Sequence, residues 1–389
     1  MRRGPTTTVV LAAASMLATG AAAQSTSEQA EIADLRNRIA ALEQANATAA
    51  DRPRLAFSLG ESTTVSIYGF VRAEAFYDFD FAQGDLSRAG RVGDPAFATD
   101  GEFDTSVRVS RFGIRSATET DIGTIGTQLE FDLFGSGGDD SSSPNLRLRH
   151  ANVTIGDSLL FGQFWTNFMP LVHYPTTADF NGPVGISFAR VPQARYTYNN
   201  SNGLTLSASI EESNGGSSDP IFTAAALYEA DKFSLRGAVL AGEFDGPGGE
   251  SLTTNGLTLS AGFEPWKGGN VAVTYVTGQA LGNLLIGGGT RSVGGVENDS
   301  DGFTIQLRQD IGEKWNVGIA YGNESYDLPS LIGAGANSFT DLESLHVSAF
   351  YTPIENLTFA LEYIRIESDG PAGFSESADR IGASITYRF

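Results

Sequence analysis

The sequence predicts an all-β fold, a transmembrane antiparallel β-barrel of about 16 strands. Three observations support this prediction. No run of residues beyond the first 23 approaches the roughly 18 apolar residues that a membrane-spanning helix needs. Glycine is abundant, with 46 residues, and the chain carries 25 phenylalanines and 12 tyrosines. From residue 63 onward, apolar side chains alternate with polar or small ones, which is the period of a strand with one oily and one wet face.

The first predicted strand shows the alternation most clearly. In the stretch TTVSIYGFVRAEAFYDFDF, Val71 and Phe79 share one parity, whereas Arg72, Glu74 and Asp78 share the other. The stretch is 19 residues long, far longer than the roughly six residues of an average strand in a soluble sheet. The same pattern recurs over residues 125–133, 204–210, 233–241, 257–263, 303–308, 315–321, 357–363 and 381–389.

The connections between these stretches are of two kinds. Seven are short polar turns, near residues 119–121, 156–158, 199–203, 229–232, 265–270, 311–314 and 353–356. Eight are longer and rich in Gly, Ser, Asp or Asn, at about residues 82–103, 135–144, 169–191, 211–219, 243–251, 279–300, 323–339 and 367–378. Alternating short and long connections join 16 strands with both ends on the short-turn side, which is typical of an outer-membrane barrel. Closure is required because lipid offers no hydrogen bonds to an open edge.

Residues 1–23 have the pattern of a secretory signal peptide. Arg2 and Arg3 precede a short apolar core, and Ala21–Ala23 offers a small-residue cleavage site. The alternative is an N-terminal anchor helix, although no stop-transfer pattern follows. The chain has no cysteine, and its net charge of −21 argues against nucleic-acid binding.

Residues 24–47 predict a short coiled coil. An a/d seam runs along this segment, formed by Ile32, Leu35, Ile39 and Leu42. We therefore expect self-association at this end, and Ile at a with Leu at d by itself favours two strands. The alternative is a lone amphipathic helix packed on its own barrel. Residues 48–62 are predicted as a linker, and residues 63–389 as the barrel domain.

A barrel of about 16 strands leaves an aqueous lumen. The polar positions of each alternating strand, which we call the wet parity, would line it. The predicted pore-lining or substrate-binding residues are Arg72, Glu74, Arg111, Arg115, Arg147, Arg149, Arg190 and Arg195. Such arginines would attract anions and bind carboxylates bidentately. The other interpretation is a charge ladder that merely balances the acidic residues. The strand parity leaves Arg147 and Arg149 ambiguous.

The third long segment differs from the others: with its flanks, over residues 166–198, it holds four prolines and many apolar residues. We expect it to fold into the lumen as a constriction loop, or alternatively to pack at a subunit interface. No catalytic pattern is found: His150, His173 and His346 share no motif, and no cofactor or metal is expected. We therefore predict that the chain is not an enzyme.

The sequence resembles the DcaP-like porins from about Ser66 to Phe389. The likeness is strongest in SIYGFVRAEAFYDF, SRFGIRS, RLRHANVTIGDSLLFGQFWTNFM and ARVPQARYTYN. The resemblance implies a homotrimer of 16-stranded channels in the outer membrane of a Gram-negative bacterium, in contact with lipid and lipopolysaccharide. It also implies small anionic solutes such as dicarboxylates. The C-terminal aromatic Phe389 is the expected signal for the outer-membrane assembly machinery.

Three functions remain open at this stage. The first is a diffusion channel that favours small anions such as carboxylates, and the second is a general or cation-favouring porin. The third is an adhesin or a barrel hydrolase. A hydrolase would need a catalytic Ser/His or Asp/His set near the rim, and the sequence shows none.

Overall fold

A computed structural model describes residues 55–135, 144–213, 217, 219–246, 248–331 and 338–389. The predicted signal peptide (1–23) and coiled coil (24–47) lie outside the described residues, and with them the seam of Ile32, Leu35, Ile39 and Leu42. Both remain predictions.

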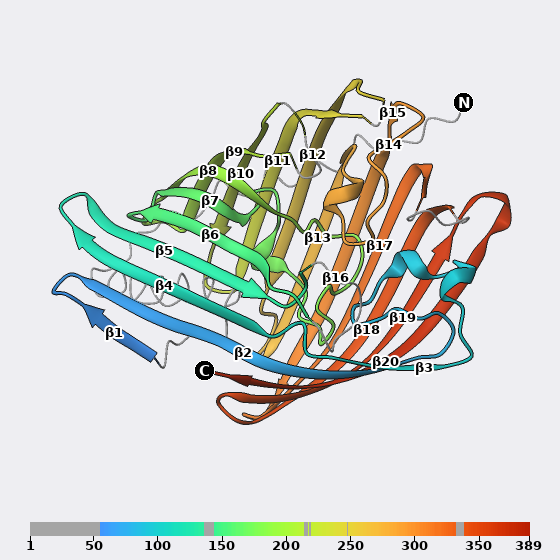
Figure 1. The fold of residues 1–389 in the computed structure, drawn as a ribbon, viewed down its shortest axis with the longest axis horizontal. Helices are drawn as coiled ribbons and strands as arrows, with labels where there is room; N and C mark the ends of the chain where they lie inside the picture. Colours follow the sequence, from blue (N-terminus) through green and yellow to red (C-terminus); the bar gives the residue numbers. More distant parts are fainter. Residues whose placement is uncertain (1–54, 136–143, 214–216, 218, 247, 332–337) are drawn as a thin grey trace.

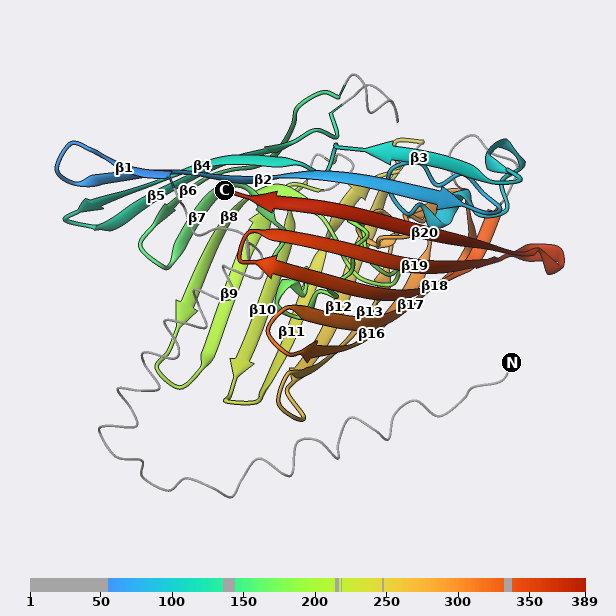
Figure 2. The same cartoon turned by 90° about the horizontal axis from the view of Figure 1, so that it is seen from below.

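Sixteen antiparallel strands close into a barrel, as predicted (Figure 1). β2 (Thr63–Asp78) pairs with β4 on one edge and with β20 (Ser375–Arg388) on the other, which closes the sheet and brings the C-terminus beside β2 (Figure 2). The other barrel strands are β4 (Arg111–Thr120), β5 (Gly123–Asp132), β6 (Arg147–Ile155), β7 (Leu159–Trp165), β8 (Arg190–Asn199), β9 (Leu204–Glu211), β10 (Ile221–Glu229), β11 (Phe233–Asp245), β12 (Ser251–Phe263), β13 (Gly269–Gln279), β16 (Asp299–Ile311), β17 (Trp315–Leu331), β18 (Ser338–Ile354) and β19 (Leu357–Asp369).

Two further strands extend the sheet along β2. β3 (Glu102–Ser106) pairs with the last residues of β2, and β1 (Leu55–Leu59) pairs with its first residues. β1 lies inside the segment predicted as a linker, so the end of that segment is a strand. Its apolar residues alternate over only five positions directly after Pro53, a signal too short to distinguish from a loop.

The small elements lie in the connections. They are the hairpin β14 (Ser292–Val293) and β15 (Val296–Glu297) and the 3₁₀ helices η1 (Ala89–Arg91), η2 (Pro95–Phe97), η3 (Leu171–His173), η4 (Gly282–Leu284) and η5 (Pro371–Gly373). None of the helical segments in the part of the chain that the structure describes is long and apolar enough to cross a bilayer.

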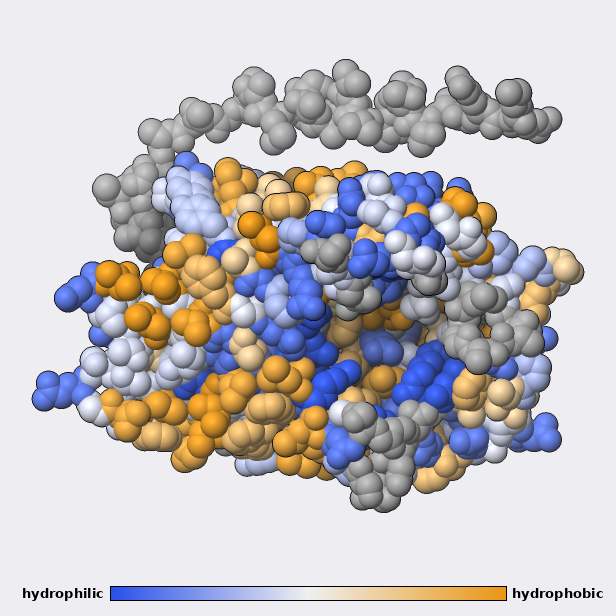
Figure 3. All heavy atoms as spheres, turned by 45° about the horizontal axis from the view of Figure 1, so that its top comes forward, coloured by the Kyte–Doolittle hydropathy of each residue, from blue (hydrophilic) through white to orange (hydrophobic). Residues whose placement is uncertain are grey.

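The outer face of the barrel is apolar, because the exposed parity carries the large hydrophobic side chains. Val71, Phe112 and Leu129 are all at least 42% exposed on this face. Aromatic residues mark its short-turn end, namely Tyr196, Tyr198, Tyr228, Trp266, Trp315, Phe359 and Tyr387. Figure 3 shows hydrophobic residues along the outside of the strands and hydrophilic residues around a hollow. An apolar band with an aromatic girdle suits a lipid bilayer.

The long-loop half of the lumen is filled by three loops. The loop between β2 and β3 (loop 1, 79–101), that between β7 and β8 (loop 3, 166–189) and that between β13 and β16 (loop 6, 280–298) contribute to one buried hydrophobic cluster with the inner wall. Phe168 of loop 3 and Leu281 of loop 6 are fully buried there. The lumen is therefore packed at the long-loop end.

Candidate functional site

Loop 3 crosses the lumen, as the sequence predicted for a constriction loop. Its backbone amides donate to inward-facing side chains of distant strands: Val184 to Ser344 Oγ of β18 at 3.0 Å, and Gly185 to Glu324 Oε2 of β17 at 3.0 Å. The amide of Asp179 donates to Glu362 of β19. A chain segment that enters from β7 and reaches β17–β19 must span the barrel interior, so loop 3 narrows the lumen.

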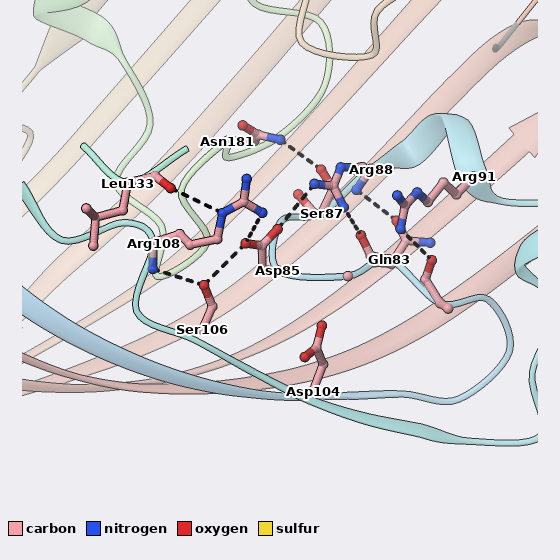
Figure 4. A network of polar contacts seen from close by, with 12 residues as sticks. Gln83, Asp85, Ser87, Arg88, Arg91, Asp104, Ser106, Arg108, Leu133 and Asn181 are labelled. Carbon is pink, nitrogen blue, oxygen red and sulfur yellow. Dashed lines mark hydrogen bonds and ion pairs between the residues drawn. The ribbon is translucent and has the colours of Figure 1, made fainter. Parts of the chain in front are cut away.

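Loop 1 braces loop 3 through one carboxylate. Asp179 of loop 3 accepts bonds from the amide and the hydroxyl of Ser87 in loop 1 at 2.9 and 2.7 Å, and Asn181 Nδ2 donates to the Ser87 carbonyl at 2.8 Å. Loop 1 is itself held by Asp85, which pairs with Arg108 at 2.8 Å (Figure 4). The constriction loop is thus held both by the barrel wall, through β17–β19, and by loop 1.

Five arginines lie close together on neighbouring strands at the level of loop 3, and we call them the arginine wall: Arg72, Arg111, Arg147, Arg149 and Arg190. All five were predicted as pore-lining. Arg72 contacts Glu74 at 2.7 Å and also donates to the carbonyl of Ala178 in loop 3. The wall therefore meets the constriction loop directly.

Three carboxylates stand within the arginine wall. Asp132 accepts two bonds from Arg147 at 2.9 and 2.7 Å and one from Arg149 at 2.9 Å. Glu130 accepts from Arg149 at 2.7 Å and lies 3.5 Å from Arg111. Together with Glu74, these acids offset three of the five positive charges. The ion pairs form a charge ladder in which five arginines stand against three carboxylates.

Arg190 carries part of this excess. Its guanidinium lies 5.0 Å from the ring of Trp165, and its Nη1 is buried without a hydrogen-bond partner. No ion pair involving Arg190 is found among the described residues. A cationic group held against an aromatic face with a donor to spare is suited to bind an anion.

A β-bulge explains the ambiguous parity of β6. Glu130 pairs with His150, but Phe131 pairs with Leu148, so Arg149 is an extra residue in the ladder. The bulge turns Arg149 and His150 inward together, with exposures of 1% and 4%. Arg147 and Arg149 therefore both face the lumen, which alternation alone could not show.

The two remaining predicted arginines lie closer to the short turns than Arg111 and Arg190 do, on the same strands β4 and β8. Arg115 shares the inward parity of Arg111 and stacks on Tyr68 at 4.3 Å. Arg195 donates to the Trp165 carbonyl at 2.5 Å and to Gln193 Oε1 at 2.8 Å. Arg236 of β11 and Arg308 of β16 were not among the predicted pore-lining residues, although both stood on the wet parity.

Arg236 and Arg308 also hold loop 3. Arg236 donates to the carbonyl of Asn167, and Arg308 donates to Thr176 Oγ1 at 3.1 Å. Neither forms an ion pair within the part of the chain that the structure describes. Loop 3 is thus flanked by arginine on two sides of the lumen.

A cavity of about 820 Å³ opens between loop 3 and the short-turn end. Arg72, Arg111, Arg149 and Arg308 line it beside loop 3. Acidic residues line its mouth near the short turns, namely Glu229, Asp231, Glu264 and Asp310. Lys232 and Arg388 also line the mouth, where the four acidic residues outnumber them. Among the described residues, no group of three or more His, Asp or Glu side chains could hold a metal ion.

His173 anchors loop 3 to the far wall of this cavity. Its ring nitrogens lie 2.7 Å from Ser260 Oγ and 2.7 Å from Ser234 Oγ, on β12 and β11. Burial, helped by the positive charge of Arg236, lowers the pKa of His173 to about 4. His173 is therefore neutral at pH 7, and its ring bridges two hydroxyls.

Comparison with known families identifies the group. The model of the DcaP outer membrane protein family matches residues 28–224, just over half of the 389 residues. The chain belongs to the DcaP outer membrane protein family. The family resemblance seen in the sequence is thereby confirmed, and the barrel is that of an outer-membrane porin channel.

Solved structures agree on the fold of this DcaP family member. The outer membrane channel DcaP of Acinetobacter baumannii superposes with a TM-score of 0.76 at 23% identity, covering 86% of this chain and 99% of that one. The anion-selective porin from Comamonas acidovorans gives 0.58 at 13% identity, covering 84% and 100%. OmpT of Vibrio cholerae gives 0.57 at 14%, covering 85% and 99%. A search of curated proteins gave no match.

Proposed function

We propose that the protein is a passive channel of the outer membrane that favours small anions, carboxylates and dicarboxylates among them. The observation that carries the proposal is the arginine wall, where five guanidiniums face three carboxylates at the level of loop 3. Low-dielectric walls focus the field of such a cluster on a passing ion. Arginine also matches a carboxylate with two parallel hydrogen bonds.

The similarity to an anion-selective porin and to the DcaP channel supports this proposal. We further propose a homotrimer, because porins of this fold include trimer forms. Removal of residues 1–23, recognition of Phe389 by the assembly machinery and contact with lipid and lipopolysaccharide belong to the same proposal. The backbone of Phe389 pairs with Gly69 of β2, which places the last residue in the closing seam. The proposal assigns no catalytic step to the lumen.

A general or cation-favouring porin is the second candidate. The acidic mouth favours it, because Glu229, Asp231, Glu264 and Asp310 meet the solute at the short-turn end. Charges at the constriction should act on a solute more strongly than charges at the mouth, because a charge acts most strongly where the passage is narrow and water is scarce. We therefore assign the selectivity to the arginine wall.

The test is the reversal potential of single channels in a KCl gradient across a planar bilayer. Wild type should reverse on the anion-selective side. Arg111→Gln and Arg190→Gln should move the potential toward zero, because Glu130 keeps Arg149 as a partner and Arg190 has no ion pair to lose. Arg365→Gln is the matched control, since Arg365 lies near the long-loop end of β19 with its side chain 40% exposed. A wild-type channel that selects cations would refute the proposal.

A further inference from the structure

The cavity below loop 3 is only half polar, a feature that a preference for small anions does not require. Beside the arginines, the cavity has an apolar lining that comes mostly from loop 3: Met169, Leu171, Val172, Pro175, Phe180 and Phe188. A passage for small hydrophilic ions alone gains nothing from such a surface, because hydrated ions make no favourable contact with it. The apolar lining therefore points to a second recognition element.

Four aromatic rings form a continuous cluster on this apolar side. Phe188 lies 5.0 Å from Trp165, 5.8 Å from Tyr174 and 6.2 Å from Phe180, measured between ring centroids. All four rings line the cavity, and Phe180 and Phe188 are only half-buried. We call these four residues the aromatic cluster. Tilted and edge-on contacts of this kind leave ring faces and edges available to a further ring.

The aromatic cluster and the arginine wall meet at loop 3. The guanidinium of Arg149 lies 5.6 Å from the ring of Phe180 and 5.6 Å from that of Trp165. Arg72 binds the carbonyl of Ala178, two residues before Phe180. Arg72 Nε is a buried donor without a hydrogen-bond partner. A spare donor thus lies close to a half-buried aromatic surface.

We propose that this cavity binds aromatic carboxylates, with the carboxylate on the arginine wall and the ring on the aromatic cluster. The inference rests on the proposed anion preference and narrows it to a solute class. The volume of about 820 Å³ is within the range of about 300–1,000 Å³ of small-molecule sites. An aliphatic carboxylate of the same charge would use only the arginine half. A neutral aromatic amide would use only the ring half.

The test compares three probes on single channels held in KCl: benzoate, acetate and benzamide. Benzoate should block or bind at a concentration at least about tenfold lower than acetate or benzamide, because it alone uses both halves of the site. Phe180→Leu should remove most of this difference. Phe161→Leu is the matched control, since Phe161 lies on the outer face of β7 and is 44% exposed.

The outcomes separate the two proposals. Equal action of benzoate and acetate on a channel that still selects anions would overturn the aromatic inference and leave the proposed function intact. Equal action of benzoate and benzamide would overturn it as well, because charge would then be irrelevant. Cation selectivity in KCl without any probe would instead refute the proposed function. A Phe161→Leu variant that lost the benzoate preference would also contradict the assignment to the aromatic cluster.

Discussion

The two halves of the lumen are built on different principles. Toward the long loops, loops 1, 3 and 6 pack against the inner wall, and Phe168, Leu281 and Leu342 are fully buried. Toward the short turns, the lumen stays open as a cavity of about 820 Å³ with half-exposed charges and rings. Fixed packing in one half holds loop 3 so that the other half can present an ordered set of charges. The structure therefore separates stability from solute contact.

The largest effect should come from a buried ion pair in the packed half. Arg380 donates to Asp78 at 2.5 and 2.8 Å, and both side chains are at most 2% exposed. Arg380→Met would leave a buried carboxylate uncompensated and should lower the free energy of unfolding by about 4 kcal/mol. Urea unfolding in detergent micelles, followed by tryptophan fluorescence, measures the loss. The double variant Asp78→Leu, Arg380→Met should recover most of it.

The matching change in the open half should be mild. Arg147 also pairs with a carboxylate, but its side chain is 35% exposed and Asp132 keeps Arg149 at 2.9 Å. Arg147→Gln should therefore lower the free energy of unfolding by about 1 kcal/mol or less. Equal losses for Arg380→Met and Arg147→Gln would contradict the division of the lumen into two halves.

A pair of phenylalanines in loop 3 gives the second comparison. Phe168 is fully buried in the hydrophobic cluster, so Phe168→Ala should leave a cavity and lower the free energy of unfolding by about 3 kcal/mol. Phe180 is half-buried at the cavity, and Phe180→Ala should lower it by about 1 kcal/mol. The same urea titration measures both variants. A larger loss of unfolding free energy for Phe180→Ala than for Phe168→Ala would contradict the assignment of the structural core to the long-loop half.

The contact between Asp179 of loop 3 and Ser87 of loop 1 should affect the single-channel current. The carboxylate of Asp179 accepts from the Ser87 amide and hydroxyl and from the amides of Asn181 and Gly182. Asp179→Asn turns one acceptor into a donor that faces a donor, a loss of about 2 kcal/mol in loop attachment. We expect single-channel recordings to gain frequent brief closures. Asp104→Asn, in β3, is the control and should not increase the frequency of brief closures.

Acidification should loosen the other anchor of loop 3. The pKa of His173 is lowered to about 4 in the folded protein, so the unfolded chain binds the extra proton more readily. Its contribution to stability is present above pH 6.5 and is lost as the pH falls from about 6.5 to about 4, by about 2 kcal/mol at pH 5. Channel noise recorded from pH 7 to pH 5 should rise in wild type. The rise should be absent in His173→Gln.

Most of the fold could be predicted from the sequence, because alternation and turn chemistry are local. The inward parity of Arg72 and Glu74 and the outward parity of Phe112 followed from the period of two alone. The alternating order of seven short turns and eight long connections also matches the structure, because each connection carries its own polar or glycine-rich composition. Three long connections are shorter than predicted: β17 and β18 extend into 323–339, and only 246–250 and 370–374 separate strands where 243–251 and 367–378 were expected.

The candidate site could be predicted only in part. The bulge at Arg149 changes parity without a sequence signal, and loop 1 meets loop 3 through Ser87 and Asp179, which are 92 residues apart. Arg236 and Arg308 were visible on the wet parity, but nothing local marked them as partners of loop 3. The aromatic cluster was hidden for the same reason, since Trp165 and Phe188 meet only once loop 3 folds inward. Contacts between distant segments depend on tertiary packing, which alternation does not encode.

The most direct test of the account is to locate an anion in the lumen. Crystals of the detergent-solubilised protein grown with bromide would reveal bound anions by anomalous diffraction. We predict a bromide peak in contact with the guanidinium of Arg190 or Arg111, and its loss in Arg190→Gln, Arg111→Gln. Bromide found only outside the lumen, or unchanged in that double variant, would contradict the claim that the arginine wall binds the passing anion.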